Sequence, residues 1–425
     1  MAKYYRSTFI RLITSFIVLL FLSLLPAATA HADGSFPILG VLHAGNAPEA
    51  LAVDTQTHLL YIAYENPGLL VAFDPISGTV RWRTPLPDSA TDVQVDSVSH
   101  HVFASAVSYS KHRSNLYVLD GTNGKIVAIL YSGNGDNSIA LDTHLHIAYA
   151  VSIDQNIIYK YTFLSGWQNG PISIQSSHFS SGKNPAAIGV NSRLGRLYIA
   201  DDTTNQVTVI NENNGHTLAT IPVAAFPISP LRVDEATGRV YVVGSMGQEL
   251  DVIDGNTNRV FARVPVSPYP EGIAFNTATG QIYVADEGNQ ANNNNSDSGT
   301  TITVIDGRSF TVIGTLAVGP GPDGVEADPA LHRVYVAIED SNTVEEIADS
   351  TNLPLTSLNT SLQIVKAHET VSLLQRAMIL TLIIMILTIV GSTLGALLPR
   401  WRVRETPRTP PMSASSHSEP HSLPQ

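Results

Sequence analysis

The chain contains no cysteine among its 425 residues. Disulfide bridges, thiol nucleophiles and thiolate metal ligands are therefore excluded. Charged residues are also scarce, at 14% of the chain, and the 24 Lys and Arg are outnumbered by 36 Asp and Glu. Between residues 31 and 375 the imbalance grows to 16 basic against 34 acidic residues. A segment this acidic repels phosphate backbones, so we expect no binding to nucleic acid.

Linear catalytic motifs are missing as well. The sequence holds no GxSxG nucleophile elbow, no HExxH metal motif, no phosphate-binding glycine loop and no dinucleotide fingerprint. No catalytic residue and no certain cofactor can therefore be named from a motif.

One long apolar run lies near each end of the chain. Leu12–Leu25 follows three basic residues and precedes a string of small residues that ends at Ala32. This order predicts a secretory signal peptide over residues 1–32, and the alternative is an N-terminal anchor that is not cleaved. Ala377–Leu398 contains 22 residues and no charge, which is long enough to span a membrane as a helix. The sequence therefore predicts an exported chain with a C-terminal membrane anchor.

The anchor divides the rest of the chain into three parts. Four arginines follow it, whereas only Arg376 lies directly before it. The positive-inside bias thus predicts a single-pass protein with residues 33–350 outside the cell. Residues 351–376 form a juxtamembrane stalk in this interpretation. Residues 399–425 form a cytoplasmic tail, whose Pro, Ser and His content is typical of disorder.

A repeat fills the predicted ectodomain. Seven times, an Asp or Asn is followed seven residues later by Tyr or Phe, and successive aromatics lie 42 to 52 residues apart. The pairs are Asp54/Tyr61, Asp96/Phe103, Asp142/Tyr149, Asn191/Tyr198, Asp234/Tyr241, Asn276/Tyr283 and Asp328/Tyr335. This period is that of a four-stranded propeller blade. We therefore predict an all-β fold, a seven-bladed β-propeller, with the Asp and Asn in structural roles at the turns.

The seventh unit lacks its fourth strand. Upstream of the first unit, Leu39–Gly45 repeats the pattern that fills the fourth strand of the sixth unit, Ile313–Gly319. We therefore predict that the N-terminal segment supplies the missing strand and closes the ring. The third unit departs most from the repeat, because residues 163–185 are more than a plain fourth strand needs.

The second strands of the units carry a recognisable motif. They begin YIAY at Tyr61, YIAD at Tyr198, YVVG at Tyr241, YVAD at Tyr283 and YVAI at Tyr335, and a proline precedes several first strands. The chain resembles the YVTN-repeat β-propellers, the group that includes the YncE-like and surface-layer-type proteins, over residues 36–350. The resemblance implies the propeller fold but no reaction.

Loop positions at the propeller mouth point to a candidate site. Five residues before the Asp or Asn, and four residues after the aromatic, acids recur in the first, sixth and seventh units, which are neighbours in a closed ring. These acids are Glu49, Glu271 and Asp323 in the first column and Glu65, Glu287 and Glu339 in the second. Oxygen ligands in such an arc suit Ca²⁺ or a cationic ligand. The alternative is that the acids only solvate the loops of an acidic protein.

The sequence favours a membrane-anchored extracellular module that binds a protein, a glycan or a small ligand on its loop face without turnover. The alternative is a propeller enzyme, a lyase or lactone hydrolase, that uses the mouth acids.

Overall fold

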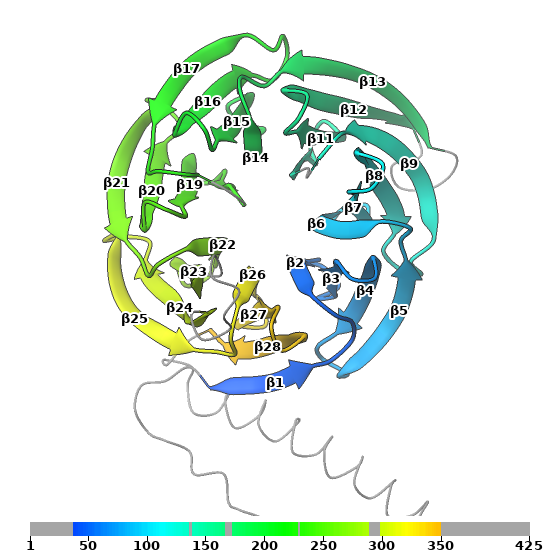
Figure 1. Ribbon diagram of the computed structural model, residues 1–425, viewed down its shortest axis with the longest axis vertical. Helices are drawn as coiled ribbons and strands as arrows, with labels where there is room; N and C mark the ends of the chain where they lie inside the picture. Colours follow the sequence, from blue (N-terminus) through cyan, green and yellow to red (C-terminus); the bar gives the residue numbers. More distant parts are fainter. Residues whose placement is uncertain (1–36, 136–137, 166–171, 228–229, 289–297, 350–425) are drawn as a thin grey trace, which may run out of the picture. The chain divides into compact units, whose positions relative to one another are not determined.

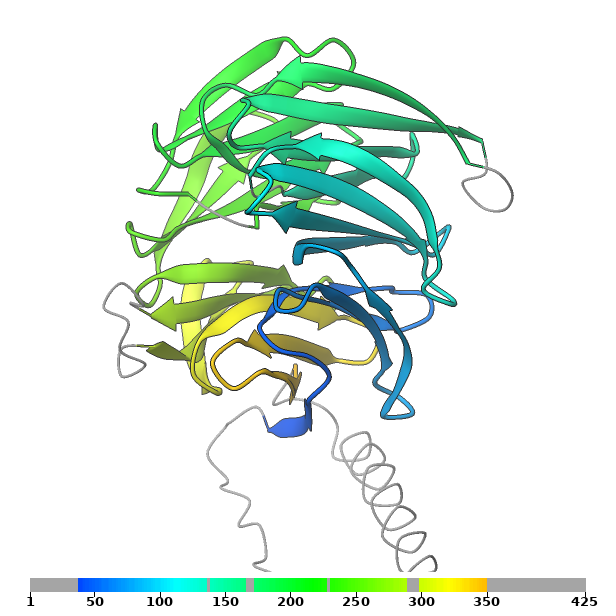
Figure 2. The ribbon, with the colours of Figure 1, turned by 45° about the vertical axis from the view of Figure 1, so that its right-hand side comes forward.

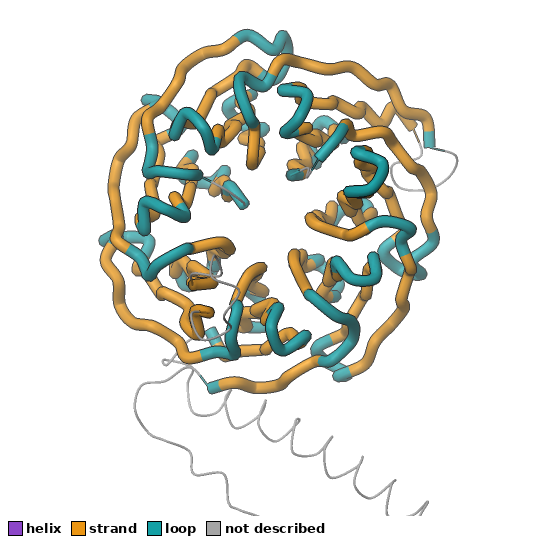
Figure 3. The backbone as a smooth tube through the Cα atoms, viewed as in Figure 1, coloured by secondary structure: helices purple, strands orange, loops and turns teal. Residues whose placement is uncertain are grey.

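The computed structural model describes residues 37–349, except 136–137, 166–171, 228–229 and 289–297. In this part of the chain, 28 strands form seven four-stranded antiparallel sheets. The sheets are arranged as blades around a central axis (Figures 1 and 3). The predicted seven-bladed all-β propeller is therefore confirmed.

Each blade is numbered from the first complete sheet, and its strands run outward from the axis in chain order. Blade 1 holds β2 (Pro48–Val53), β3 (Leu60–Tyr64), β4 (Leu69–Asp74) and β5 (Thr79–Pro85). Blade 2 holds β6 (Ser89–Asp96), β7 (His101–Ser108), β8 (Arg113–Asp120) and β9 (Ile126–Gly133). Blade 3 holds β10 (Ile139–Asp142), β11 (Ile147–Ser152), β12 (Ile157–Ser165) and β13 (Ser173–Ser180).

The remaining blades follow the same plan. Blade 4 holds β14 (Pro185–Asn191), β15 (Arg196–Asp201), β16 (Gln206–Asn211) and β17 (Thr217–Pro222). Blade 5 holds β18 (Arg232–Asp234), β19 (Arg239–Gly244), β20 (Glu249–Asp254) and β21 (Arg259–Pro265). Blade 6 holds β22 (Pro270–Phe275), β23 (Gln281–Gly288), β24 (Ser298–Asp306) and β25 (Thr311–Ala317). Blade 7 holds β26 (Pro322–Asp328), β27 (Arg333–Ile338), β28 (Thr343–Ala348) and, outermost, β1 (Ile38–Leu42).

The outermost strand of blade 7 comes from the other end of the propeller sequence. β1 pairs antiparallel with β28, with Val41 opposite Glu345 and Leu42 opposite Val344. The predicted closure by the N-terminal segment is therefore confirmed. The closure gives the last blade its fourth strand and covers the edge that β28 would otherwise expose.

The repeated Asp and Asn cap the turn after each innermost strand. Asp54 Oδ1 accepts hydrogen bonds from the backbone N–H groups of Gln56 and Thr57, at 2.9 and 3.2 Å. Bonds of the same kind occur at the other six positions. The predicted structural role of this column is therefore confirmed.

The repeated aromatics lie between neighbouring blades. All seven are at most 1% exposed. The Tyr61 hydroxyl donates to the backbone carbonyl of Gly121 in blade 2, at 3.2 Å. Burial of a large ring at every blade junction explains why a unit needs its neighbours in order to fold.

The described residues contain no helix that is long and apolar enough to cross a membrane. The predicted signal peptide, stalk, membrane helix and tail lie outside these residues, as does most of the asparagine-rich segment after β23.

Candidate functional site

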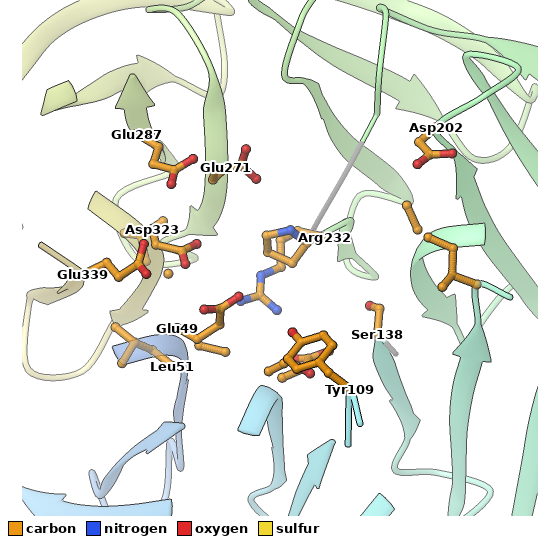
Figure 4. A pocket seen from close by; sticks show the side chains of 18 residues that line it. Glu49, Leu51, Tyr109, Ser138, Asp202, Arg232, Glu271, Glu287, Asp323 and Glu339 are labelled. Carbon is orange, nitrogen blue, oxygen red and sulfur yellow. The ribbon is translucent and has the colours of Figure 1, made fainter. Parts of the chain in front are cut away.

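A cavity of about 430 Å³ lies where the innermost strands converge on the axis. Seven carboxylates and one basic side chain are among the described residues that line it (Figure 4). The acids are Glu49, Asp92, Asp202, Glu271, Glu287, Asp323 and Glu339. Five of the six predicted site residues therefore line one cavity, which we call the funnel.

The acids of the first predicted column sit at the inner ends of three adjacent strands. Glu49, Glu271 and Asp323 are each the second residue of an innermost strand, β2, β22 and β26. Glycine follows two of them, and a Cβ on Gly324 would lie 2.4 Å from the Glu49 carbonyl oxygen. A Cβ on Gly272 would lie 2.2 Å from the Asp323 carbonyl oxygen. The Glu-Gly and Asp-Gly pairs thus let the three strands approach closely, which brings their acids together.

The acids of the second column are placed by backbone bonds between loops. The N–H group of Glu287 donates to the Tyr269 carbonyl at 3.0 Å, and that of Glu339 donates to the Gly321 carbonyl at 2.9 Å. Glu65 has the same kind of bond to Ala47, at 2.9 Å. Glu65 is nevertheless not part of the funnel lining. Its Oε1 instead accepts a hydrogen bond from the Tyr109 hydroxyl at 3.2 Å, and Tyr109 lines the funnel (Figure 4).

Mutual repulsion and burial raise the pKa values of the central acids. Burial is the largest cause of the raised Asp323 pKa, and the charges of Glu49, Glu271, Glu287 and Glu339 add to it. The Glu271 pKa is raised by burial and by its hydrogen-bonded neighbour Glu287. Both carboxyls therefore bind protons more tightly than they would in an unfolded chain.

The one basic residue among the described lining residues is Arg232, at the start of β18. Its Nη2 lies 3.0 Å from Glu326 Oε2 in blade 7, and its Nε donates to the Ile273 carbonyl of blade 6 at 2.9 Å. Figure 4 shows its guanidinium near the middle of the funnel, close to Glu49 in this view. Arg232 therefore reaches from blade 5 past blade 6 to blade 7.

Sequence reasoning missed Arg232 although a signal was present. Two residues before the repeated Asp or Asn, the other blades carry Ala, Gln or Gly, with one exception. That exception is Glu326, the partner of Arg232. Opposite charges in a column of otherwise neutral residues could have identified the pair.

Asp92 was also missed. It is 9% exposed, and its Oδ2 accepts a hydrogen bond from the Ile139 N–H group at 2.7 Å. Burial raises its pKa to about 6, although this bond and the charge of Arg232 act in the opposite direction. Asp92 follows Thr91 in β6, one position after the repeat position that holds Glu49, Glu271 and Asp323 in other blades.

The arrangement of the carboxylates limits what they can hold. Among the described residues, no group of three or more His, Cys, Asp or Glu side chains could hold a metal ion. Most of the carboxylates are instead spread along one side of the funnel, whereas Ser138, Tyr109 and the single carboxylate of Asp202 lie toward the other side (Figure 4). A ligand that spreads positive charge over several atoms fits this distribution better than a single ion does.

Comparison with known proteins gives no closer assignment, because no family model and no curated protein matches the chain.

Proposed function

We propose that this propeller is a non-catalytic binding module of the YVTN-repeat type, which recognises a cationic ligand in its funnel. The observation that carries the proposal is the excess of carboxylates in the funnel, seven acids against one base among its described lining residues. A cavity of about 430 Å³ is of a size that suits a small ligand or the tip of a larger one. An organic polyamine or a lysine-rich peptide would place several ammonium groups against the acids.

The funnel also has one property that favours the alternative function, a lyase or lactone hydrolase. Asp92 has a pKa of about 6, and a carboxyl that titrates near neutral pH can transfer protons during catalysis. Turnover of a neutral lactone that depends on Asp92 would support this second candidate.

The binding proposal is tested by adding spermine or CaCl₂ separately to the full-length protein in detergent micelles. We expect spermine to raise the melting temperature more than Ca²⁺ at equal concentration, because its charges are spread over a chain of atoms. The double variant Glu271→Gln/Asp323→Asn should bind spermine at least tenfold more weakly by calorimetry. Glu65→Gln is the comparison variant, since Glu65 touches the funnel lining only through Tyr109, and it should change spermine binding by less than about twofold.

The same double variant has a defined pH dependence without ligand. A carboxyl whose pKa is higher in the folded than in the unfolded protein lowers the free energy of unfolding as the pH rises between these two values. The variant should therefore be more stable than the wild type at pH 8, and the difference should shrink toward pH 4.

The ligand experiment has two outcomes that would contradict the proposal. A rise in melting temperature with Ca²⁺ but not with spermine would make the funnel a divalent-cation site. An unchanged melting temperature with both cations would mean that the acids form only a hydrated surface.

We also propose that the propeller is held outside the cell by a membrane helix at residues 377–398 after removal of residues 1–32. The apolar runs and the arginines after residue 399 support this topology. Protease added to intact cells should digest the propeller and leave a C-terminal fragment that contains residues 377–425. An intact propeller after this treatment, with digestion only after lysis, would contradict the topology.

A further inference from the structure

A second cavity lies on the rim of the propeller, between blades 2 and 3. It has a volume of about 410 Å³ and lies between the outer strand β9 of blade 2 and the outer strands β12 and β13 of blade 3. We call it the rim groove. Blade 3 is the unit whose sequence departs most from the repeat, and Figure 2 shows its β12–β13 hairpin extending outward beyond its neighbours.

Three tyrosines form the aromatic surface of the rim groove. Tyr131 from β9 meets Tyr159 edge to face, with ring centres 5.6 Å apart and an interplanar angle of 79°. Tyr159 and Tyr161 from β12 are nearly parallel, at 8°, with centres 6.4 Å apart. Tyr161 is only 4% exposed, so Tyr131 and Tyr159 are the rings that the two blades present to the rim groove.

The protein fixes the orientation of these rings. The Tyr159 hydroxyl donates to Gln155 Oε1 at 2.7 Å, and the Tyr161 hydroxyl donates to the backbone carbonyl of Tyr131. The guanidinium of Arg113 lies 5.5 Å from the centre of the Tyr131 ring. A platform that is ordered before binding loses little conformational entropy when a ligand arrives.

Besides the tyrosines, the described lining of the rim groove holds three aliphatic residues, Ile129, Leu130 and Ile174, and three neutral polar ones, but no carboxylate, lysine or arginine. Ser176 and His178 of β13 are exposed and lie opposite Tyr161 and Tyr159 in the strand register, so they supply a hydroxyl and an imidazole group beside the rings. The lining therefore offers apolar ring faces and neutral hydrogen-bonding groups at once.

Two other blade junctions also carry aromatic side chains on their outer strands. Between blades 1 and 2, Trp82 Nε1 donates to the Gly121 carbonyl at 2.8 Å. Between blades 5 and 6, Phe261 and Phe310 meet edge to face at 5.7 Å, and Arg239 lies over both rings. At the junction of blades 2 and 3 the tyrosines line an open cavity instead.

We propose that the rim groove is a second binding site, and that it takes a neutral oligosaccharide. A sugar ring has C–H faces that pack on aromatic rings and hydroxyl groups that exchange hydrogen bonds with serine and histidine. The absence of charge from the described lining matches a neutral ligand, in contrast to the funnel. An extended peptide would pair with the free edge of β13, whereas the rim groove presents side chains of two blades.

The test is calorimetry of the full-length protein in detergent micelles with three neutral sugars, cellohexaose, maltohexaose and hexa-N-acetylchitohexaose. We expect at least one of these to bind, and Tyr159→Ala to weaken that binding at least tenfold by removing a ring face. Tyr159→Phe keeps the ring and should bind within about threefold of the wild type. Phe261→Ala, at an exposed aromatic of another blade junction, is the control and should change nothing.

Ser176→Arg keeps the test independent of the tyrosine packing. Ser176 is exposed on an outer strand, so the substitution should leave the fold intact while its side chain and charge obstruct the rim groove. Binding should then be lost. No binding of any of the three sugars at millimolar concentration would overturn the proposal, and so would binding that survives both Tyr159→Ala and Ser176→Arg. Binding of an extended peptide of alternating Thr and Val with blocked ends, in place of the sugars, would also overturn the proposal. It would indicate that the peptide adds as a strand to the edge of β13.

Discussion

Deletion of residues 36–45 is expected to unfold the propeller at temperatures where the intact protein is stable. The deletion removes β1, the strand that pairs with the outer edge of β28 in the described part of the chain. It also removes Leu42 and Ala44, which pack against the buried cluster that joins blades 7 and 1. Loss of a whole strand and its core contacts should lower the free energy of unfolding by roughly 4 kcal/mol or more. Thermal denaturation followed by circular dichroism measures the effect.

A peptide added in trans distinguishes loss of closure from general damage. The strand contacts its blade without following β28 in sequence, so a synthetic peptide of residues 36–46 should pair with β28 and recover part of the lost stability. A scrambled peptide of the same composition is the control. A deletion variant with an unchanged melting temperature would show that β1 does not close the ring.

The sequence predicted the ring well because each blade repeats the same local physics. An Asp or Asn that caps the turn and an aromatic that fills a blade junction recur at a fixed separation of seven residues, so seven copies identify seven blades. The strand that closes the ring was found in the same way, because Leu39–Gly45 shares the pattern of a fourth strand.

The same reasoning located the acidic arc because loop position is also repeated. It could not decide that Glu65 lies outside the funnel lining, since this depends on where a flexible side chain turns after its backbone is fixed. It also did not predict links between blades made by side chains. One example is His100 in the turn of blade 2, whose Nδ1 lies 2.6 Å from Asp54 Oδ2 in blade 1.

Contacts between blades that are not neighbours in the ring were the hardest to predict. Arg232 and Glu326 are 94 residues apart and belong to blades 5 and 7, which are not neighbours in the ring. They meet because the arginine side chain is long enough to reach past blade 6. The repeat marks the two positions by their opposite charges in an otherwise neutral column, but it does not show that the two side chains meet.

Arg232→Met should therefore have a large effect on stability. The substitution leaves Glu326 without its ion-pair partner and removes the single positive charge from the described lining of the acidic funnel. The side chains of Arg232 and Glu326 are only 20% and 21% exposed, so water replaces the lost interaction poorly. We expect the free energy of unfolding to fall by roughly 3 kcal/mol at pH 8, measured by urea denaturation.

A surface ion pair provides the matched control. Arg81 pairs with Asp74 at 2.5 Å, but its side chain is 54% exposed. Arg81→Met should therefore cost less than about 1 kcal/mol under the same conditions. Equal losses for the two arginine variants would contradict the special role of Arg232.

The loss caused by Arg232→Met should depend on pH with a defined sign. Burial already raises the pKa of Glu326 and raises that of Asp92 to about 6, while the charge of Arg232 lowers both. Without the arginine, the pKa values of both carboxyls in the folded protein rise further. The free energy of unfolding therefore falls over a wider pH range as the pH increases. The deficit of the variant should be small near pH 4, where these carboxyls are protonated, and should grow as pH passes through 6.

A double-mutant cycle separates the pair from the rest of the funnel. In Arg232→Met/Glu326→Gln the unpaired carboxylate is gone, so part of the stability at pH 8 should return. The part that does not return measures what Arg232 contributes against Asp92 and the other acids. If the second substitution recovered nothing, Glu326 would not be the principal partner. If it recovered everything, Arg232 would have no further role in balancing the charge of the funnel.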